Sequence, residues 1–435
     1  MPTPSLRSRF WRLCLINIAS NLTIPLVGLV DTAMLGHLPE LRFLAGVALA
    51  SLIFDYLFFG LGFLRMTTTG QTAQAQGRGD DRAVEGTLAR GVVWALGLGL
   101  ATLLLAPLLE GASFRLLSGT PEVEAAGRDY FRGRIWGAPA ALLNLVLVGW
   151  FLGREQSGRV LLLTVVANLT NVALNYWFIL RLGWAAYGAG LASALAQGLM
   201  ALLAVLLVLR SWPGSGARPT ELLAAARDRS TAQLNLDLLV RTLLLVSAFA
   251  VFTNLSALFG TVALAANTLL LRILSIGSYF IDGAAYATES LAGRELGRGD
   301  RSKLREVLRL SLIAGEAFAW LVLLPTLLAP RWVFGLLTSH DEVVGLATSW
   351  RWWLVPTLAF GAFAYILDGF FLGLTAGRTL RNAMLASALL GFGPLALWAA
   401  YGGGPTVLWI AMVMLMAART LTLAVRIPSA LAPQA

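Results

Sequence analysis

Long apolar runs recur along the whole chain and alternate with short polar connections. A helix of about 20 apolar residues is long enough to cross a bilayer, because each residue adds about 1.5 Å. The runs are too long for porin strands and lack their alternation of apolar and polar residues. We therefore predict twelve membrane-spanning helices, at Leu13–Leu35, Leu44–Thr68, Gly91–Leu109, Ile135–Leu152, Val160–Ile179, Trp184–Leu209, Leu236–Leu258, Val262–Leu291, Leu308–Leu328, Trp352–Leu372, Ala383–Tyr401 and Val407–Ile427.

Composition agrees with an all-α membrane protein. Of the 435 residues, 57% are hydrophobic and 13% are charged, whereas a soluble domain carries about 25% charged residues. The net charge of +10 does not indicate nucleic-acid binding, because the basic residues lie mainly in the connections between apolar runs. Most of them fall on one side if the N-terminus is cytoplasmic, so we expect both termini in the cytoplasm. The single cysteine and two isolated histidines give no basis for a disulfide or a metal site.

The two halves of the chain repeat each other. The sequence GRGD occurs at Gly77–Asp80 and again at Gly297–Asp300, which is an offset of 220 in the numbering. The same offset aligns Phe151–Gly153 with Phe371–Gly373. Each half has an even number of predicted spans, so the repeats should be parallel and pseudo-symmetric, related by an axis along the membrane normal.

This repeat predicts an N-terminal six-helix lobe over 1–210, a polar cytoplasmic linker over 211–235 and a C-terminal six-helix lobe over 236–435. Such a layout is typical of secondary transporters. The chain contains no GxxxxGK[ST] motif, so ATP is not expected to drive it directly. We predict a transporter with no cofactor rather than an enzyme; a membrane transferase would need an acidic pair such as DDxxD, which Asp80 and Asp81 do not form.

Asp31 is the most informative polar residue, because it lies inside the first apolar run. A carboxylate at the centre of a membrane helix costs roughly 2.5–3.5 kcal/mol, and intramembrane acids usually serve function. An acid in such a place can hold a cation when ionised and donate a hydrogen bond when protonated. Pro25 lies six residues earlier and allows the helix to bend there.

A row of amides on the fifth predicted helix could share a pocket with Asp31. Asn168, Asn171 and Asn175 are spaced by three and four residues, which places them on one helix face. Ser193 on the sixth predicted helix reaches a similar depth. We interpret these residues with Asp31 as a candidate proton and substrate site. Alternatively, the amides only hold neighbouring helices together.

Further charges lie within the predicted spans. Asp55 and Arg65 lie on the second helix and Arg272 and Asp282 on the eighth, at matching depths. Two charge pairs between the lobes would form an inner gate; pairs within one lobe, or side chains that extend to the interface, are the alternative. Asp368 in the tenth helix is a candidate for either role.

Several of these stretches resemble the DinF-like branch of the multidrug and toxic compound extrusion (MATE) family. They are NLTIPLVGLVDTAMLGHL at 21–38, FLRMTTTGQTAQAQG at 63–77, FIDGAAYATE at 280–289 and YILDGFFLG at 365–373. The resemblance implies cation-driven efflux of small organic, often cationic, compounds across the bacterial inner membrane. In this branch the driving ion is usually a proton. The family patterns place its first-helix acid on Asp31, its fifth-helix amides on Asn168, Asn171 and Asn175, and its sixth-helix hydroxyl on Ser193.

Departures from the family pattern shape the remaining expectations. The acid that often ends the fifth-helix pattern is Asn175 here, which leaves Asp31 as the sole carboxylate of the predicted pocket. Sodium-coupled relatives use acids on the seventh and tenth helices. The tenth predicted helix has Asp368, but beyond Asp237 in its first turn the seventh has no acid, so sodium coupling is the alternative and not the leading hypothesis. A lipid flippase of the same superfold is another, although a basic cavity would suit it better. We expect a monomer that contacts membrane lipid and no nucleic acid.

Overall fold

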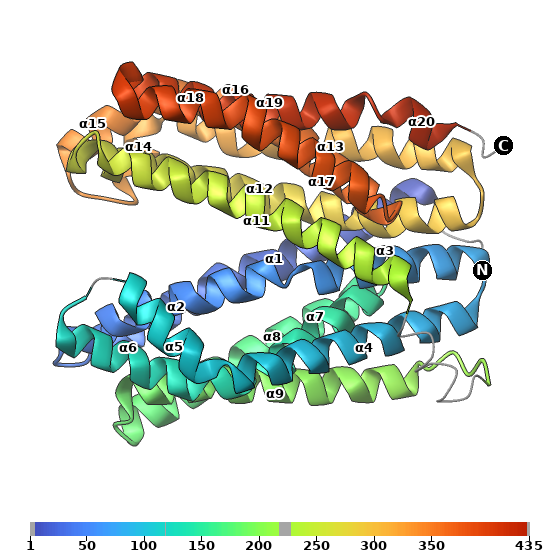
Figure 1. The fold of residues 1–435 in the computed structure, drawn as a ribbon, viewed down its shortest axis with the longest axis horizontal. Helices are drawn as coiled ribbons and strands as arrows, with labels where there is room; N and C mark the ends of the chain where they lie inside the picture. The colour runs from blue at the N-terminus through green and yellow to red at the C-terminus, as the bar shows by residue number, and fades with distance from the viewer. Residues whose placement is uncertain (1–4, 118, 217–227, 433–435) are drawn as a thin grey trace. The chain divides into compact units, whose positions relative to one another are not determined.

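The computed structural model describes residues 5–117, 119–216 and 228–432 (Figure 1). Within α1 (Leu6–Gly36), the side chains of residues 24–27, 29 and 31 are not described. The side chains of Pro25 and Asp31 therefore lie outside the described part. The described residues are almost all helical, and no strand occurs among them.

The chain forms two compact units. The N-unit comprises Ala19–Arg229, and the C-unit comprises Ser230–Ala435 together with Met1–Ile18. The helix α1 thus contributes to both. Its early part is held in the C-unit, where the Asn17 side-chain amide donates to the Gly283 carbonyl at 3.5 Å.

Long helices with short interruptions build each unit. The N-unit contains α2 (Leu41–Gly60), α3 (Phe63–Arg78), α4 (Asp81–Leu104), α5 (Ala106–Leu116), α6 (Pro121–Arg134), η1 (Ile135–Gly137), α7 (Ala138–Gly153), α8 (Ser157–Asn175), η2 (Tyr176–Arg181) and α9 (Ala185–Arg210). The C-unit contains α11 (Arg229–Ala257), α12 (Thr261–Gly297), α13 (Arg301–Leu328), α14 (Pro330–Gly335), α15 (Asp341–Trp350), η3 (Arg351–Trp353), α16 (Leu354–Gly373), α17 (Gly377–Ala386), η4 (Ser387–Phe392), α18 (Gly393–Trp398), η5 (Ala399–Gly403), α19 (Gly404–Ala424) and α20 (Ile427–Leu431).

The predicted repeat is visible in where helices begin. The starts of α2 and α12, of α4 and α13, of α6 and α15, and of α8 and α17 are all related by the offset of the GRGD segments. The two GRGD segments form the same turn. Gly79 and Gly299 adopt φ values of 69° and 74°, which glycine tolerates without steric cost. Asp80 and Asp300 then accept from the backbone N–H groups of Ala83 and Lys303, each at 3.0 Å, and so cap α4 and α13.

Glycines bring two helix pairs into backbone contact at equivalent positions. A Cβ added at Gly149 or Gly153 of α7 would lie less than 3.0 Å from carbonyl oxygens of α3. The same holds for Gly369 and Gly373 of α16 against α12. Small residues spaced by four are the usual means by which membrane helices approach closely. The pairs α3–α7 and α12–α16 are therefore packed without room for side chains at these points.

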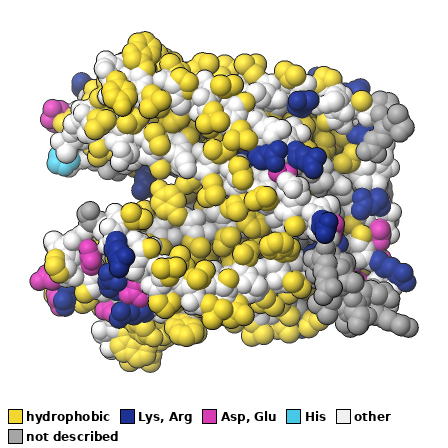
Figure 2. All heavy atoms as spheres, viewed as in Figure 1, with side chains coloured by type: hydrophobic (Ala, Val, Ile, Leu, Met, Phe, Trp, Pro, Cys, Tyr) yellow, Lys and Arg dark blue, Asp and Glu magenta, His cyan; other side chains and the backbone are white. Residues whose placement is uncertain are grey.

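Ten helical runs in the described part are long and apolar enough to cross a membrane. The last, Gly377–Leu431, holds the final two predicted segments on either side of Gly402, whose φ of 140° breaks the helix. The helix α1 holds the first predicted segment. On the face shown in Figure 2, hydrophobic side chains cover the middle of each unit and most charged ones lie toward helix ends.

Several predicted helix boundaries were wrong, and two of them show the reasons. The second span is not continuous over Leu44–Thr68, because α2 ends at Gly60 and α3 begins at Phe63. Gly60 and Gly62 flank the break, and glycine weakens a helix by about 1 kcal/mol relative to alanine. The third helix starts at the Asp80 cap rather than at Gly91, because a good cap extends a helix beyond its apolar part.

Candidate functional site

The amides of α8 form a hydrogen-bonded row with α9. The Asn175 side-chain amide donates to the Asn171 side-chain oxygen at 3.0 Å, and Asn171 in turn donates to the Ser193 hydroxyl at 3.1 Å. Asn171 and Asn175 are 6% and 0% exposed, so their polar atoms depend on protein partners. The structure therefore brings these three predicted residues together.

Asn168 connects the same helix to α1. Its side-chain amide donates to the backbone carbonyl of Thr23 at 3.4 Å. Thr23 lies eight residues before Asp31 on α1, about 12 Å along a regular helix. The face of α8 that carries the amides is thus directed toward α1 and α9. The side chains of Asp31 and Pro25 lie outside the described residues, so their contacts with this row are not described.

Sequence reasoning missed a second amide pair in the N-unit. Asn144 of α7 donates to both the backbone carbonyl and the side-chain oxygen of Gln197 on α9, at 3.0 and 2.8 Å. Asn144 is 4% exposed. Gln197 follows Ser193 by four residues, which places the two polar residues on one face of α9. The four-residue spacing of Ser193 and Gln197 could have indicated a polar face on α9. Asn144 gave no such indication, because it is a lone amide in a Leu-rich run.

The four charges predicted to form a gate lie in different units. In the N-unit, Asp55 of α2 is exposed and interacts electrostatically with Arg134 of α6, whereas Arg65 of α3 is buried. In the C-unit, Arg272 is exposed and Asp282 is half-buried on α12. The inner gate stays a prediction.

Asp368 of α16 lies in a buried ion cluster inside the C-unit. One of its carboxylate oxygens accepts from both Arg241 of α11 and Arg419 of α19. The side chains of all three residues are at most 7% exposed. Asp282 also interacts electrostatically with Arg419. The guanidinium of Arg419 lies 5.3 Å from the centre of the Tyr365 ring, an arrangement that stabilises a buried cation.

The cluster ties three helices to one carboxylate. Burying charges is costly unless they are paired and hydrogen-bonded. Here Arg241 and Arg419 both pair with Asp368, and Asp282 supplies a second negative charge near Arg419. Arg241 and Arg419 were not among the predicted site residues. Among the described residues, no group of three or more His, Cys, Asp or Glu side chains could hold a metal ion.

The comparisons with known proteins decide the family. The MatE family model matches residues 17–177 and 238–397, one match in each half of the chain. DNA damage-inducible protein F of Escherichia coli K12 is 37% identical over 417 residues, which cover 95% of this chain and 90% of that protein. The chain belongs to the MATE family. Its resemblance to the DinF-like branch is thereby confirmed.

Other relatives of this MATE chain agree. A probable multidrug resistance protein NorM of Synechococcus is 28% identical and covers 83% of the chain and 78% of that protein. An outward-facing multidrug resistance MATE transporter superposes with a TM-score of 0.86 at 22% identity, covering 99% and 98% of the two chains. A MOP superfamily transporter from Pyrococcus furiosus superposes with a TM-score of 0.87 at 21% identity, with the same coverage. The predicted all-α fold of twelve helices in two six-helix lobes is confirmed.

The two family matches also fix the register of the repeat. One match begins at residue 17 and ends at 177, and the other begins at 238 and ends at 397, which agrees with the helix starts to within one position. At an offset of 220, Asp31 of this MATE chain corresponds to Val251 and Asn168 to Ala388. In the other direction, Asp368 corresponds to Val148 and Arg419 to Leu199. These four polar residues thus have apolar counterparts in the other unit.

Proposed function

We propose that this MATE chain exports small organic compounds, often lipophilic cations, across the bacterial inner membrane in exchange for protons. We assign the competition between proton and substrate to a site in the N-unit that comprises Asp31 on α1 together with Asn168, Asn171, Asn175 and Ser193. The names of relatives as multidrug resistance proteins support the substrate class. Both termini would be cytoplasmic, in keeping with the distribution of Lys and Arg.

The observation that carries proton coupling is the buried ion cluster around Asp368. A sodium ion needs oxygen ligands with free lone pairs and a net negative field. The Asp368 carboxylate instead accepts from two guanidinium groups, which would repel a further cation. Asp31 then remains the intramembrane acid best suited to exchange its proton for a cationic substrate.

The proposed cycle uses ordinary acid chemistry at one carboxyl. Ionised Asp31 binds the organic cation, while the neighbouring amides offer donors and acceptors of adaptable orientation. Protonation from the outer side removes the charge that holds the cation, so the substrate leaves. Pro25 has no backbone N–H and permits α1 to bend between the two states. Proton and cation exclude each other because both need the same oxygen atoms.

The test is transport of a fluorescent organic cation into proteoliposomes, with pH and sodium gradients imposed separately. The pH gradient should drive transport, and Asp31→Asn should abolish it because an amide cannot exchange a proton. Asp129→Asn, which neutralises an exposed acid on α6, is the matched control and should transport normally. Transport by Asp31→Asn at the unmodified rate, or transport driven by sodium alone, would overturn the proposal.

A further inference from the structure

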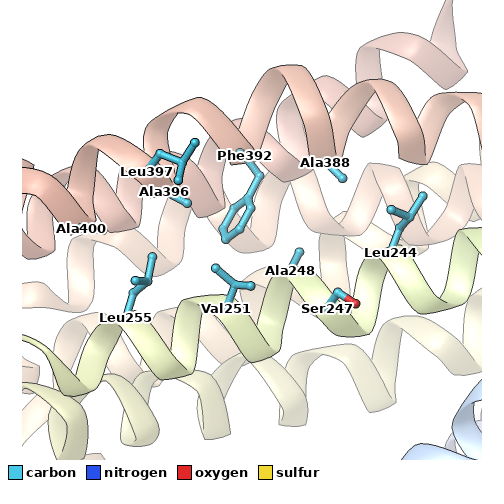
Figure 3. A pocket seen from close by; sticks show the side chains of 11 residues that line it. Leu244, Ser247, Ala248, Val251, Leu255, Ala388, Phe392, Ala396, Leu397 and Ala400 are labelled. Carbon is cyan, nitrogen blue, oxygen red and sulfur yellow. The ribbon is translucent and has the colours of Figure 1, made fainter.

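An apolar slot lies in the C-unit between α11 and the helical stretch η4–α18 (Figure 3). Its volume is about 320 Å³, at the lower end of the range for ligand sites. Val251 and Leu255 of α11 point toward it from one wall, and Phe392 points into it from the other. Ser247 is the one polar residue among the eleven that line it.

The slot is long. Its α11 wall runs from Leu244 to Leu255, which is about 17 Å of helix. A single acyl chain can lie extended along a wall of this length.

Small residues keep this space open. Ala248 on α11 faces Ala388 and Ala396 across the slot, and Gly393 adds no side chain. Protein interiors are normally packed without voids of this size, and an empty slot forfeits dispersion contacts along both walls. A molecule that always surrounds the protein could fill the slot and restore these dispersion contacts.

The surroundings of the slot indicate what that occupant is. Both walls belong to membrane-spanning runs, Arg229–Ala257 and Gly377–Leu431. Leu397 on one wall and Val251 on the other are 62% and 42% exposed, so the lining reaches the surface of these two spans. An uncharged, apolar lining at the surface of membrane-spanning helices matches an acyl chain and offers nothing to a charged headgroup or an organic cation.

We propose that this slot is a binding site for one acyl chain of a membrane lipid. It occupies the place in the C-unit that the Asp31 and Asn168 site occupies in the N-unit, since Val251 and Ala388 are their counterparts. The bound chain fills the gap between α11 and η4–α18. This lipid site does not depend on the proposed transport function.

Photo-crosslinking tests the site. The full-length protein is reconstituted with a phospholipid that carries a diazirine in the middle of one acyl chain, in vesicles of phosphatidylethanolamine and phosphatidylglycerol. Peptides are then mapped by mass spectrometry. Peptides covering 244–255 and 388–400 should be labelled more strongly than the lipid-facing surface of α13 around Ile313 and Leu321, which is exposed but has no slot.

Two filling variants and one control sharpen the result. Val251→Phe should lower labelling of the slot by roughly tenfold, which corresponds to about 1.4 kcal/mol of binding free energy. Leu243→Phe adds the same ring at an exposed position of α11 that does not line the slot and should leave labelling unchanged. If Val251→Phe fails to fold, Ala388→Leu fills the slot from the opposite wall.

Three outcomes would overturn the proposal. They are labelling of the slot no stronger than that of the α13 surface, an equal loss of labelling in Leu243→Phe, and stronger labelling by a photoreactive sterol than by the acyl probe. The sterol result would replace the single chain with a fused-ring ligand. None of these outcomes bears on ion coupling, because the readout is labelling and not transport.

Discussion

The two units share one scaffold and place opposite chemistry on it. In the N-unit the helix pair α1 and α8 carries Asp31 and a row of amides, and the equivalent pair in the C-unit encloses an apolar slot. The C-unit instead buries charge around Asp368, where the N-unit has Val148. The two copies share helix starts and turns, but their polar groups occupy different positions of the repeat. One copy carries the groups to which we assign proton exchange, and the other carries charges that are paired with one another.

The largest expected effect comes from breaking the buried ion cluster around Asp368. Asp368→Val places the N-unit residue in the C-unit and leaves Arg241 and Arg419 buried without their carboxylate. Removing one partner of a buried ion pair costs about 3–5 kcal/mol. We therefore expect a large drop in the thermal unfolding temperature measured in detergent.

A rescue variant sharpens this comparison. Adding Arg241→Asn and Arg419→Leu to Asp368→Val completes the N-unit set, Asn21, Val148 and Leu199. The triple variant removes both guanidinium groups that Asp368→Val leaves buried without a partner. Such unpaired charges account for most of the cost of breaking a buried ion pair, so the triple variant should regain most of the lost stability. If the triple variant were less stable than the single one, the view of the two units as interchangeable scaffolds would be wrong.

A smaller effect is expected from the amide row. Asn171→Ala removes both the acceptor of Asn175 and the donor to Ser193. A buried polar group left unpaired costs about 1–3 kcal/mol, and we expect both lower stability and slower transport. Leu169→Ala on the exposed side of α8 is the control. Unchanged stability and transport in Asn171→Ala would show that the row serves neither packing nor the site.

The smallest effect concerns the twin caps. The Lys303 backbone N–H and side chain, aided by Ser302, hold the pKa of Asp300 at about 2, below its ordinary 3.8. The ionised cap therefore stabilises the fold fully above the ordinary pKa, and its contribution is lost as the pH falls through about 2.

Substitution of each cap tests this interpretation of the repeat. Asp300→Ala and Asp80→Ala should each lower stability by about 1 kcal/mol at neutral pH. Only the Asp300 cap has a lysine partner, Lys303 at 3.0 Å, so its loss should also depend on salt. Unfolding temperatures at low and high ionic strength provide the measurement, and an equal salt dependence of the two variants would contradict this difference between the repeats.

Much of the fold could be predicted from the sequence because local sequence patterns determine it. Apolar runs predict spans, and the GRGD turns with their aspartate caps repeat at one offset. The amides of α8 and Ser193 were predicted to meet because helical spacing alone puts the amides on one face. The break at Leu61 was hidden, since hydropathy does not change where two glycines interrupt a helix.

The ion cluster could not be predicted in the same way. Arg241 and Asp368 are 127 residues apart in the chain, and Arg419 comes from a third helix. Nothing in the spacing of any one helix selects these partners over Arg272 or Asp282. Partner choice between distant helices depends on how the helices cross, and that arrangement is a property of the packed structure.

The paired glycines of α7 and α16 have a mechanical consequence. Where two backbones touch, neither helix can slide or roll past the other without a collision between carbonyl oxygens and Cα atoms. Within each of the pairs α3–α7 and α12–α16, the close backbone contact therefore resists any movement of one helix relative to the other. A single methyl group at Gly149 or Gly369 would collide with a backbone carbonyl oxygen of the partner helix and force the two helices apart.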